Sequence, residues 1–103
     1  MKSMFYNLSN LRQLDISNWN TNLVKYMNFM FYGCVELDII GLDKLETTSC
    51  TNFQSMFYKC SSIKNFDLST WDTSKCTNMA YMFTFAGGNI NLLGWDTTKV
   101  TTM

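Results

Sequence analysis

The sequence contains no histidine and no proline, and its charges are few and balanced. Histidine is the commonest general base and metal ligand near neutral pH, so its absence removes the usual partner of a catalytic serine or cysteine. Charged residues make up 16% of the chain, with eight Lys and Arg against eight Asp and Glu. A chain without net charge exerts no long-range attraction on nucleic acid. We therefore expect neither an enzyme nor a nucleic-acid-binding protein, and no cofactor.

Long apolar segments are also missing. No run approaches the roughly 18 apolar residues that a transmembrane helix needs, and Met1 and Lys2 are not followed by the apolar stretch of a secretion signal. We expect no membrane span and no export signal within this chain. Its 103 residues, of which 47% are hydrophobic, suffice for one domain with a modest core.

Repetition is what the chain has in abundance. The phrase WDTSKCTNMAYMF at residues 71–83 resembles LETTSCTNFQSMF at 45–57 and WNTNLVKYMNFMF at 19–31. A unit this short cannot close its own core and must stack on its neighbours. We predict a single domain, residues 1–103, of four repeats at approximately 1–26, 27–52, 53–78 and 79–103. A Met-Phe pair marks each repeat, every 26 residues, at Met4-Phe5, Met30-Phe31, Met56-Phe57 and Met82-Phe83.

Residues at matching positions of the repeats form columns of similar size and polarity. The four cysteines fall in two of them, where the other repeats have Leu, Ala or Val, so we expect buried thiols. Disulfides between neighbouring repeats (Cys34 with Cys60, Cys50 with Cys76) and a four-cysteine zinc site remain alternatives. The columns used below are Leu8, Cys34, Cys60, Ala86; Leu14, Ile40, Phe66, Ile90; Trp19, Leu45, Trp71, Trp95; Thr21, Thr47, Thr73, Thr97; and Val24, Cys50, Cys76, Val100.

Two hydrophobic periods alternate within each repeat. Cys76, Met79, Met82 and Phe83 are spaced by three and four residues, which predicts one apolar face of a short helix. Spacing by two, as in Phe66-Asp67-Leu68, predicts a short strand. A strand and a helix in each repeat indicate an α/β fold.

The strand segment LRQLDISNW (11–19) and its copy IKNFDLSTW (63–71) are similar to the leucine-rich-repeat scheme LxxLxLxxN. The full phrase MFxxCxxLxxLDLSxWDTSxVTNM resembles the 26-residue repeat of bacterial surface proteins, as in mycoplasma-type lipoproteins and BspA-like leucine-rich repeats. The resemblance implies a leucine-rich-repeat-like solenoid of four 24–26-residue strand-turn-helix coils with a short parallel sheet on its concave face. It also implies a cell-surface or extracellular protein, without catalytic activity, that acts in adhesion or recognition.

Two candidate surfaces follow from this architecture. The concave face would bind a protein or glycan partner, or would simply be solvated. Its candidate partner-binding residues are Arg12, Gln13, Asp15, Asp38, Lys64, Asn65, Asp67 and Asn91.

The ends of the chain form the second surface. Met1 and Met103 occupy the same column, and neither end shows a polar capping repeat of the kind that stacked repeats need for solubility. We expect either an excerpt of a longer array or ends covered by other copies, stacked head to tail into a filament. The candidate assembly residues are Met1, Met4, Phe5, Trp95, Val100 and Met103.

Overall fold

The computed structural model describes all 103 residues and consists mostly of turns. Its regular elements are four three-residue strands and one 3-10 helix, and it has no α-helix. The molecule measures 35 × 27 × 23 Å along its principal axes. In chain order the elements are β1 (Gln13–Asp15), β2 (Asp38–Ile40), η1 (Leu42–Lys44), β3 (Asn65–Asp67) and β4 (Asn89–Asn91).

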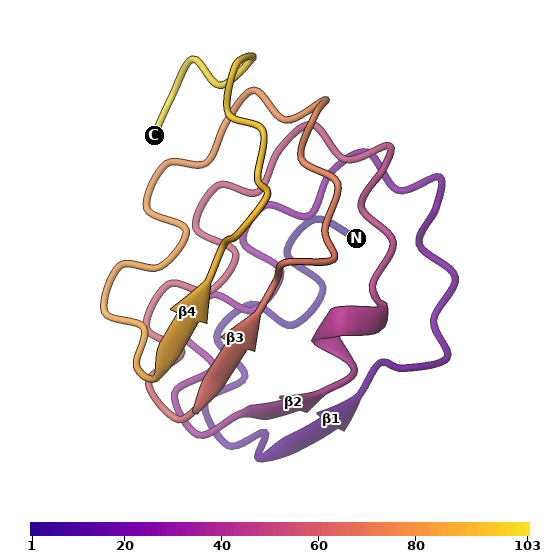
Figure 1. Cartoon of the computed structure of the whole chain (residues 1–103). Helices are drawn as coiled ribbons and strands as arrows, with labels where there is room; N and C mark the ends of the chain where they lie inside the picture. The colour runs from indigo at the N-terminus through magenta and orange to yellow at the C-terminus, as the bar shows by residue number, and fades with distance from the viewer.

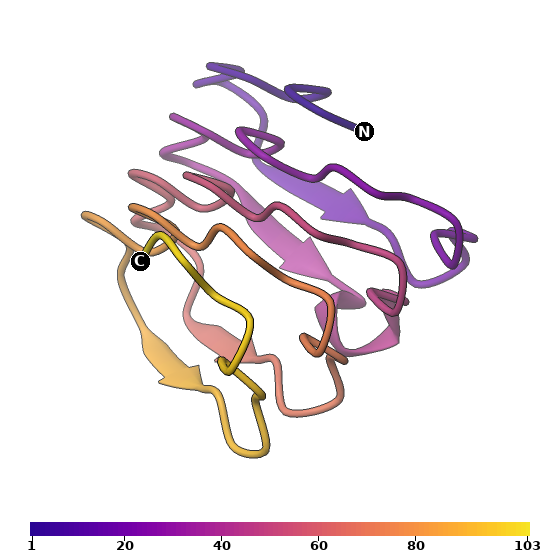
Figure 2. The ribbon, with the colours of Figure 1, turned by 90° about the horizontal axis from the view of Figure 1, so that it is seen from above.

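Successive segments of the chain lie side by side, from indigo at the first to yellow at the last (Figures 1 and 2). Backbone hydrogen bonds join residues about one repeat apart, for example the Phe31 N–H to the Met56 carbonyl at 3.0 Å. We call residues 1–26, 27–52, 53–78 and 79–103 layers 1 to 4.

The predicted helices are absent, so the α/β leucine-rich-repeat-like solenoid of strand-turn-helix coils is wrong. The Met-Phe segments are runs of tight turns. Along residues 29–34 the backbone N–H groups alternate: those of Phe29, Phe31 and Gly33 donate to layer 3. Those of Met30, Tyr32 and Cys34 donate three residues back. An α-helix needs every N–H to bond four residues back, and here half of them are used between layers instead.

The turns require left-handed backbone at two places in each layer. In layer 2 these are Phe29 (φ 59°) and Gly33 (φ 75°), and in layer 3 Ser55 and Lys59. A residue with a side chain loses about 1–2 kcal/mol in this conformation. The N–H groups of these same residues donate to the next layer at 2.8–2.9 Å. Bonds between layers therefore offset the local strain.

The strands pair in two separate two-stranded parallel sheets, β1 with β2 and β3 with β4. A single sheet through all four repeats was predicted and is not found. The predicted alignment of Phe66 with Ile90 is confirmed. That of Leu14 with Ile40 is wrong, because Leu14 pairs with Ile39.

The sheet is divided between layers 2 and 3, and β2 is the only strand that is followed by a 3-10 helix, η1. Gly41 precedes η1 with φ 94°, and a Cβ there would lie 2.6 Å from the backbone of Ser17. Only glycine combines that conformation with such a close approach. The turn at Gly41 restores the one-residue offset of β2, so that Ile16 and Leu42 are both buried, one repeat apart.

One hydrophobic cluster of 20 buried residues runs through the stack. The phenylalanines of the repeated Met-Phe pairs, Phe31, Phe57 and Phe83, form one row along it, in which adjacent rings stack with centroids 5.8 Å apart. Three members of the threonine column, Thr21, Thr47 and Thr73, are buried too, and each of their hydroxyls bonds to the next layer, as the Thr47 Oγ1 does to the Asp72 carbonyl at 3.0 Å. The core is thus built by matching columns in contact.

Candidate interaction surfaces

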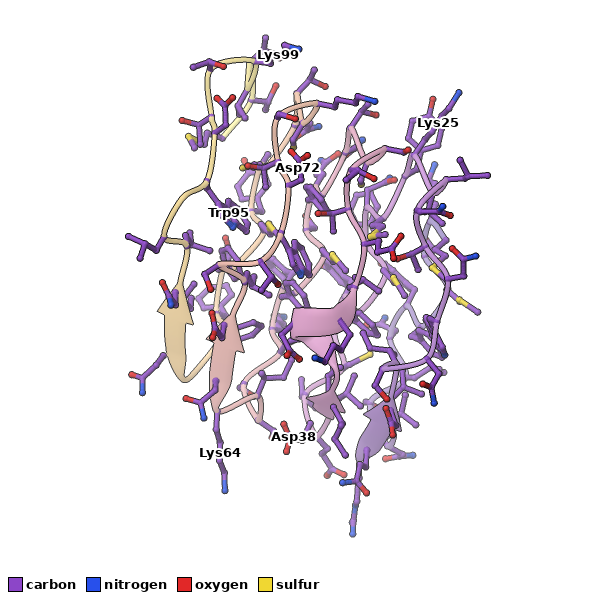
Figure 3. The ribbon with its side chains drawn as sticks, turned by 45° about the vertical axis from the view of Figure 1, so that its right-hand side comes forward. Lys25, Asp38, Lys64, Asp72, Trp95 and Lys99 are labelled. Atoms are coloured by element: carbon purple, nitrogen blue, oxygen red, sulfur yellow. The ribbon has the colours of Figure 1, made fainter.

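The first candidate surface consists of the outward side chains of β1 to β4 together with Arg12 and Lys64, and we call it the strand face. Figure 3 shows Asp38 and Lys64 projecting from the body of the molecule near the strands. Packing does not use these side chains, because the residues between them, such as Phe66, point into the core. All eight predicted partner-binding residues, Arg12, Gln13, Asp15, Asp38, Lys64, Asn65, Asp67 and Asn91, are exposed.

The register of β1 and β2 decides which side chains of the strand face lie opposite one another. Asp38 lies opposite Gln13 because of the one-residue shift in register. The Arg12 Nε instead donates to Glu36 Oε2 at 3.2 Å. Such an exposed ion pair contributes at most about 1 kcal/mol. Asp38 and Lys64 have no ion-pair partner and remain available to a ligand.

Asp15 and Asp67 have a local structural role. The Asp15 Oδ1 accepts hydrogen bonds from the Ser17 backbone N–H at 2.9 Å and from its hydroxyl at 2.6 Å. Asp67 makes the same pair of bonds with Ser69. These bonds stabilise the ionised carboxylate and lower the pKa of both aspartates. Both residues therefore hold the turn that follows each strand, and substituting them would disturb more than a binding surface.

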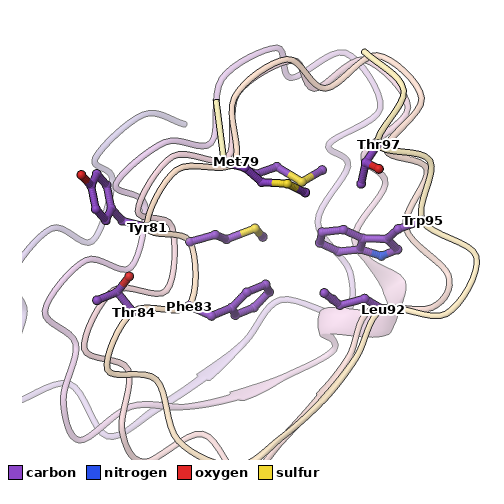
Figure 4. Close-up of a pocket in the computed structure, with 9 residues that line it drawn as sticks. Met79, Tyr81, Phe83, Thr84, Leu92, Trp95 and Thr97 are labelled. Atoms are coloured by element: carbon purple, nitrogen blue, oxygen red, sulfur yellow. The ribbon is translucent and has the colours of Figure 1, made fainter. Parts of the chain in front are cut away.

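The second candidate surface is the C-terminal end of the stack, which is hollowed by a cavity of about 660 Å³ (Figure 4). Seven of its nine lining residues are apolar. Trp95 and Met103 were predicted as end residues, whereas the other seven were not. The lining residues are Met79, Tyr81, Met82, Phe83, Thr84, Leu92, Trp95, Thr97 and Met103.

The column pattern could have identified the missed residues. Phe83, Leu92 and Thr97 belong to columns that are buried in the middle layers, whereas in layer 4 they are half-buried or exposed. The predicted end residue Val100 is half-buried and packs against the core. A column that is buried elsewhere and exposed in the last layer is therefore the sequence signature of this surface.

The N-terminal end presents the opposite side of the same columns. Met1 and Phe5 are half-buried, and Met4 is 54% exposed. In the next layer the residue that matches Met4, Met30, is fully buried. The two ends are thus the uncovered faces of a structure whose other layers are covered on both sides.

A row of stacked tyrosines, missed by the sequence analysis, runs along the turn side. The Tyr32 ring lies 4.8 Å from that of Tyr6 and 4.6 Å from that of Tyr58, nearly parallel to both. Burial and the neighbouring phenols raise the pKa of Tyr32. Tyr32 therefore has a ring on each face, whereas Tyr6 and Tyr58 each have a tyrosine stacked on one face only.

The cysteines are free and buried, which confirms the expected core role and contradicts the two disulfides. The Cys60 thiol donates to the Phe31 carbonyl at 3.1 Å. Burial raises the pKa of Cys50 and Cys60 to about 12, so neither is a thiolate near neutral pH. No group of three or more His, Cys, Asp or Glu is placed to hold a metal ion, so the four-cysteine zinc site is not formed.

Stacked layers with shared columns, an exposed polar strand face and two uncovered ends define a repeat protein of stacked turns and short strands. The family model described as Mycoplasma protein of unknown function, DUF285, matches residues 1–103, and the chain belongs to this family. The match agrees with the mycoplasma-type part of the resemblance and does not extend to BspA-like leucine-rich repeats. Comparison with curated proteins and with solved structures gave no match. None of the helices in the structure has the length and apolar character of a membrane span.

Proposed function

We propose that this protein is a non-enzymatic recognition module that binds a protein or glycan partner through its strand face. The observation that carries the proposal is the exposure of Arg12, Gln13, Asp38, Lys64 and Asn65 on or beside short strands. The inward residues of these strands include the buried Phe66 and the half-buried Leu14 and Ile39, which pack against the core. Rigid strands hold exposed side chains in fixed positions, which lowers the entropy lost when a partner binds.

The surface chemistry favours a polar partner. Asp38 and Lys64 supply unpaired charges of both signs, and Gln13, Asn65 and Asn91 supply amides that both donate and accept hydrogen bonds. Sugar hydroxyls and exposed peptide groups have the same mixed character. A protein loop or a glycan matches this surface better than a nucleic acid, whose phosphates need a net positive surface.

We propose a non-enzymatic protein because of the protonation and hydrogen bonding of its cysteine and aspartate side chains. The chain has no histidine, and the thiols of Cys50 and Cys60 stay protonated because burial raises their pKa to about 12. The carboxylates of Asp15 and Asp67 accept hydrogen bonds from serines of the same turns. We therefore propose no catalytic role for these groups.

The setting we propose is the cell surface or the extracellular space. This part of the proposal rests on the resemblance of the repeats to those of bacterial surface proteins. Labelled antibody against intact and permeabilised cells of the source organism tests it. Labelling that appears only after the cells are permeabilised would contradict a surface location.

The binding proposal is tested with a printed glycan array and immobilised extracellular-matrix proteins, probed with the labelled chain. The matched variants are Asp38→Lys with Lys64→Glu, which reverse two unpaired charges without touching the turn aspartates. Lys75→Glu, an exposed residue away from the strands, is the control. We expect binding to at least one probe that the double variant loses and the control retains. No binding to any probe, or equal loss in the control, would refute the proposal.

A further inference from the structure

We propose that a shallow cavity on the turn side of the stack is a binding site for a neutral sugar ring. The cavity has a volume of about 380 Å³, within the range of about 300–1,000 Å³ usual for small-molecule sites. Its lining residues belong to the turns of layers 2, 3 and 4 and to none of the strands. The site is therefore separate from the strand face and goes beyond the function proposed above.

A missing ring in one residue column opens the cavity. The column is Ser3, Phe29, Ser55 and Tyr81, so a serine of layer 3 stands between aromatic residues of layers 2 and 4. The stacked tyrosine rings on this side lie 4.6–4.8 Å apart between centroids, one layer from the next. Phe29 and Tyr81 are two layers apart, and both line the cavity. They therefore bracket a space that takes one further ring, and layers of this chain bound it on both sides.

A second small residue widens the space. Thr84 takes the place in layer 4 that Tyr32 and Tyr58 have in layers 2 and 3. Tyr32 stacks on Tyr58 at 4.6 Å, and no tyrosine of layer 4 continues the row. Phe85 meets the Tyr58 ring edge to face, with centroids 5.7 Å apart, and does not line the cavity. Figure 4 shows Tyr81 and Thr84 together on the outer side of their turn. The two small residues thus form one cavity.

Polar groups at the bottom of the cavity lack partners. Ser55 lines it, is only 4% exposed, and its hydroxyl makes no hydrogen bond within the chain. The Gln54 Oε1 accepts from the Asn78 Nδ2 at 3.3 Å, which holds the amide in place and leaves the Gln54 NH2 group without an acceptor. An unpaired polar group in a buried position is unfavourable. A ligand that offers hydroxyl groups to Ser55 and Gln54 would remove this cost.

These features match a sugar ring better than a purely aromatic one. The faces of a pyranose carry C–H groups that pack on aromatic side chains such as Phe29 and Tyr81. Its rim carries hydroxyls, each of which donates and accepts hydrogen bonds. A phenyl ring would fill the same space and leave Ser55 and Gln54 unpaired. No charged residue lines the cavity, which favours a neutral sugar.

Variants that fill the cavity follow from the other repeats. Ser55→Phe copies layer 2, where Phe29 adopts φ 59° against φ 53° for Ser55, so the backbone of the turn accepts the ring. Thr84→Tyr copies Tyr58 and continues its row. Ser3→Phe makes the first change at the matching position of layer 1, which does not line the cavity, and is the control. All three should keep a cooperative thermal unfolding transition.

Saturation-transfer NMR measures binding, with the methyl glycosides of glucose, galactose and mannose as separate probes. We expect the native chain and Ser3→Phe to transfer saturation to the C–H protons of at least one probe. Each filled variant should bind that probe at least about tenfold more weakly, because it loses stacking surface and hydrogen bonds to the ligand. Titrating the native chain with the probe should shift the amide signals of Gln54, Ser55 and Tyr81, which locates the site without any substitution.

Several results would overturn the proposal. These are a native chain that binds none of the three sugars, filled variants that bind as the native chain does, and amide shifts confined to other residues. Binding of N-acetyltyrosinamide in place of the sugars would overturn it too, since the occupant would then be an aromatic side chain. The strand-face variant Asp38→Lys with Lys64→Glu should leave sugar binding unchanged. Loss of sugar binding in that variant would assign the sugar to the strand face and contradict a site on the turn side.

Discussion

The two middle layers and the two end layers carry the same residue columns but differ in how much of them is covered. Phe31 and Phe57 are fully buried, whereas Phe5 and Phe83 in the end layers are half-buried. Phe57 has a ring stacked on each side, and Phe83 has one on its inner side only. We therefore expect a phenylalanine at the same position of the repeat to contribute more to stability in a middle layer, where both faces of its ring are covered, than in an end layer.

Truncating a phenylalanine in each kind of layer gives the largest expected difference. Phe57→Ala should lower the free energy of unfolding by about 3–5 kcal/mol, the usual range for a buried phenylalanine. Phe83→Ala should cost roughly half as much, because part of its ring is already in water. Urea unfolding measures both. Equal losses would show that the partial exposure of Phe83 does not reduce its contribution to stability.

Alkaline pH should weaken the middle layers selectively, since they hold all four thiols where the end layers have Leu8, Ala86, Val24 and Val100. The folded pKa of Cys50 and Cys60 is raised from 9.0 to about 12 by burial. Their stabilisation is therefore complete below pH 9 and is lost as the pH rises through about 12. The unfolding constant should rise by up to about tenfold per pH unit for each such thiol.

Unfolding curves between pH 8 and 11 check this expectation. Cys60→Ala should remove part of the pH dependence while lowering stability at pH 8. An unchanged slope in that variant would show that the thiol is not the group that titrates.

Substitutions in the threonine column should show a smaller difference in stability between the middle and the end layers. Thr47→Val removes the donor to the Asp72 carbonyl, and a buried acceptor left without a partner costs about 1–3 kcal/mol. Thr97→Val at the end removes a hydroxyl that has no partner, so its effect should stay within about 0.5 kcal/mol. Thermal unfolding of both variants at low concentration provides the comparison. A Thr97→Val cost equal to that of Thr47→Val would contradict it.

The smallest expected effect concerns backbone strain. Lys59 in layer 3 adopts φ 60°, and Lys59→Gly should raise the free energy of unfolding by about 0.5–1 kcal/mol by relieving that strain. Asn7 occupies the same place in layer 1 with φ 58°, and Asn7→Gly should gain less because asparagine tolerates this conformation. Denaturant midpoints measure both. A larger increase in stability for Asn7→Gly than for Lys59→Gly would contradict this prediction.

The sequence predicted which residues are buried better than it predicted how the backbone is arranged. Met27, Met30, Phe31 and Cys34 are all fully buried, as their spacing by three and four implied. The helix inferred from the same spacing is absent, because consecutive tight turns place the same positions on one side. The segment forms turns instead of a helix because alternate N–H groups donate to carbonyls of the next layer. The sequence of a single repeat does not show whether such carbonyls are within reach.

The sequence likewise predicted some features of the candidate surfaces, and the structure alone showed others. The exposure of Asp38 and Lys64 followed from the alternation along each strand. Their pairing did not, because the register of β2 depends on the turn at Gly41. The bonds of Asp15 to Ser17 are local, and the spacing of the two residues was visible in the sequence. Which backbone N–H groups donate from one layer to another appears only once the layers are stacked.

By itself, the sequence determined the 26-residue period and the columns that face inward, because a short unit gains stability only by burying one side against its neighbours. The tertiary structure alone decided that the segments between strands are turns and that the sheet is divided between layers 2 and 3. The reason is that a backbone hydrogen bond between layers depends on two segments a full repeat apart, and its formation overrides the local preference of either.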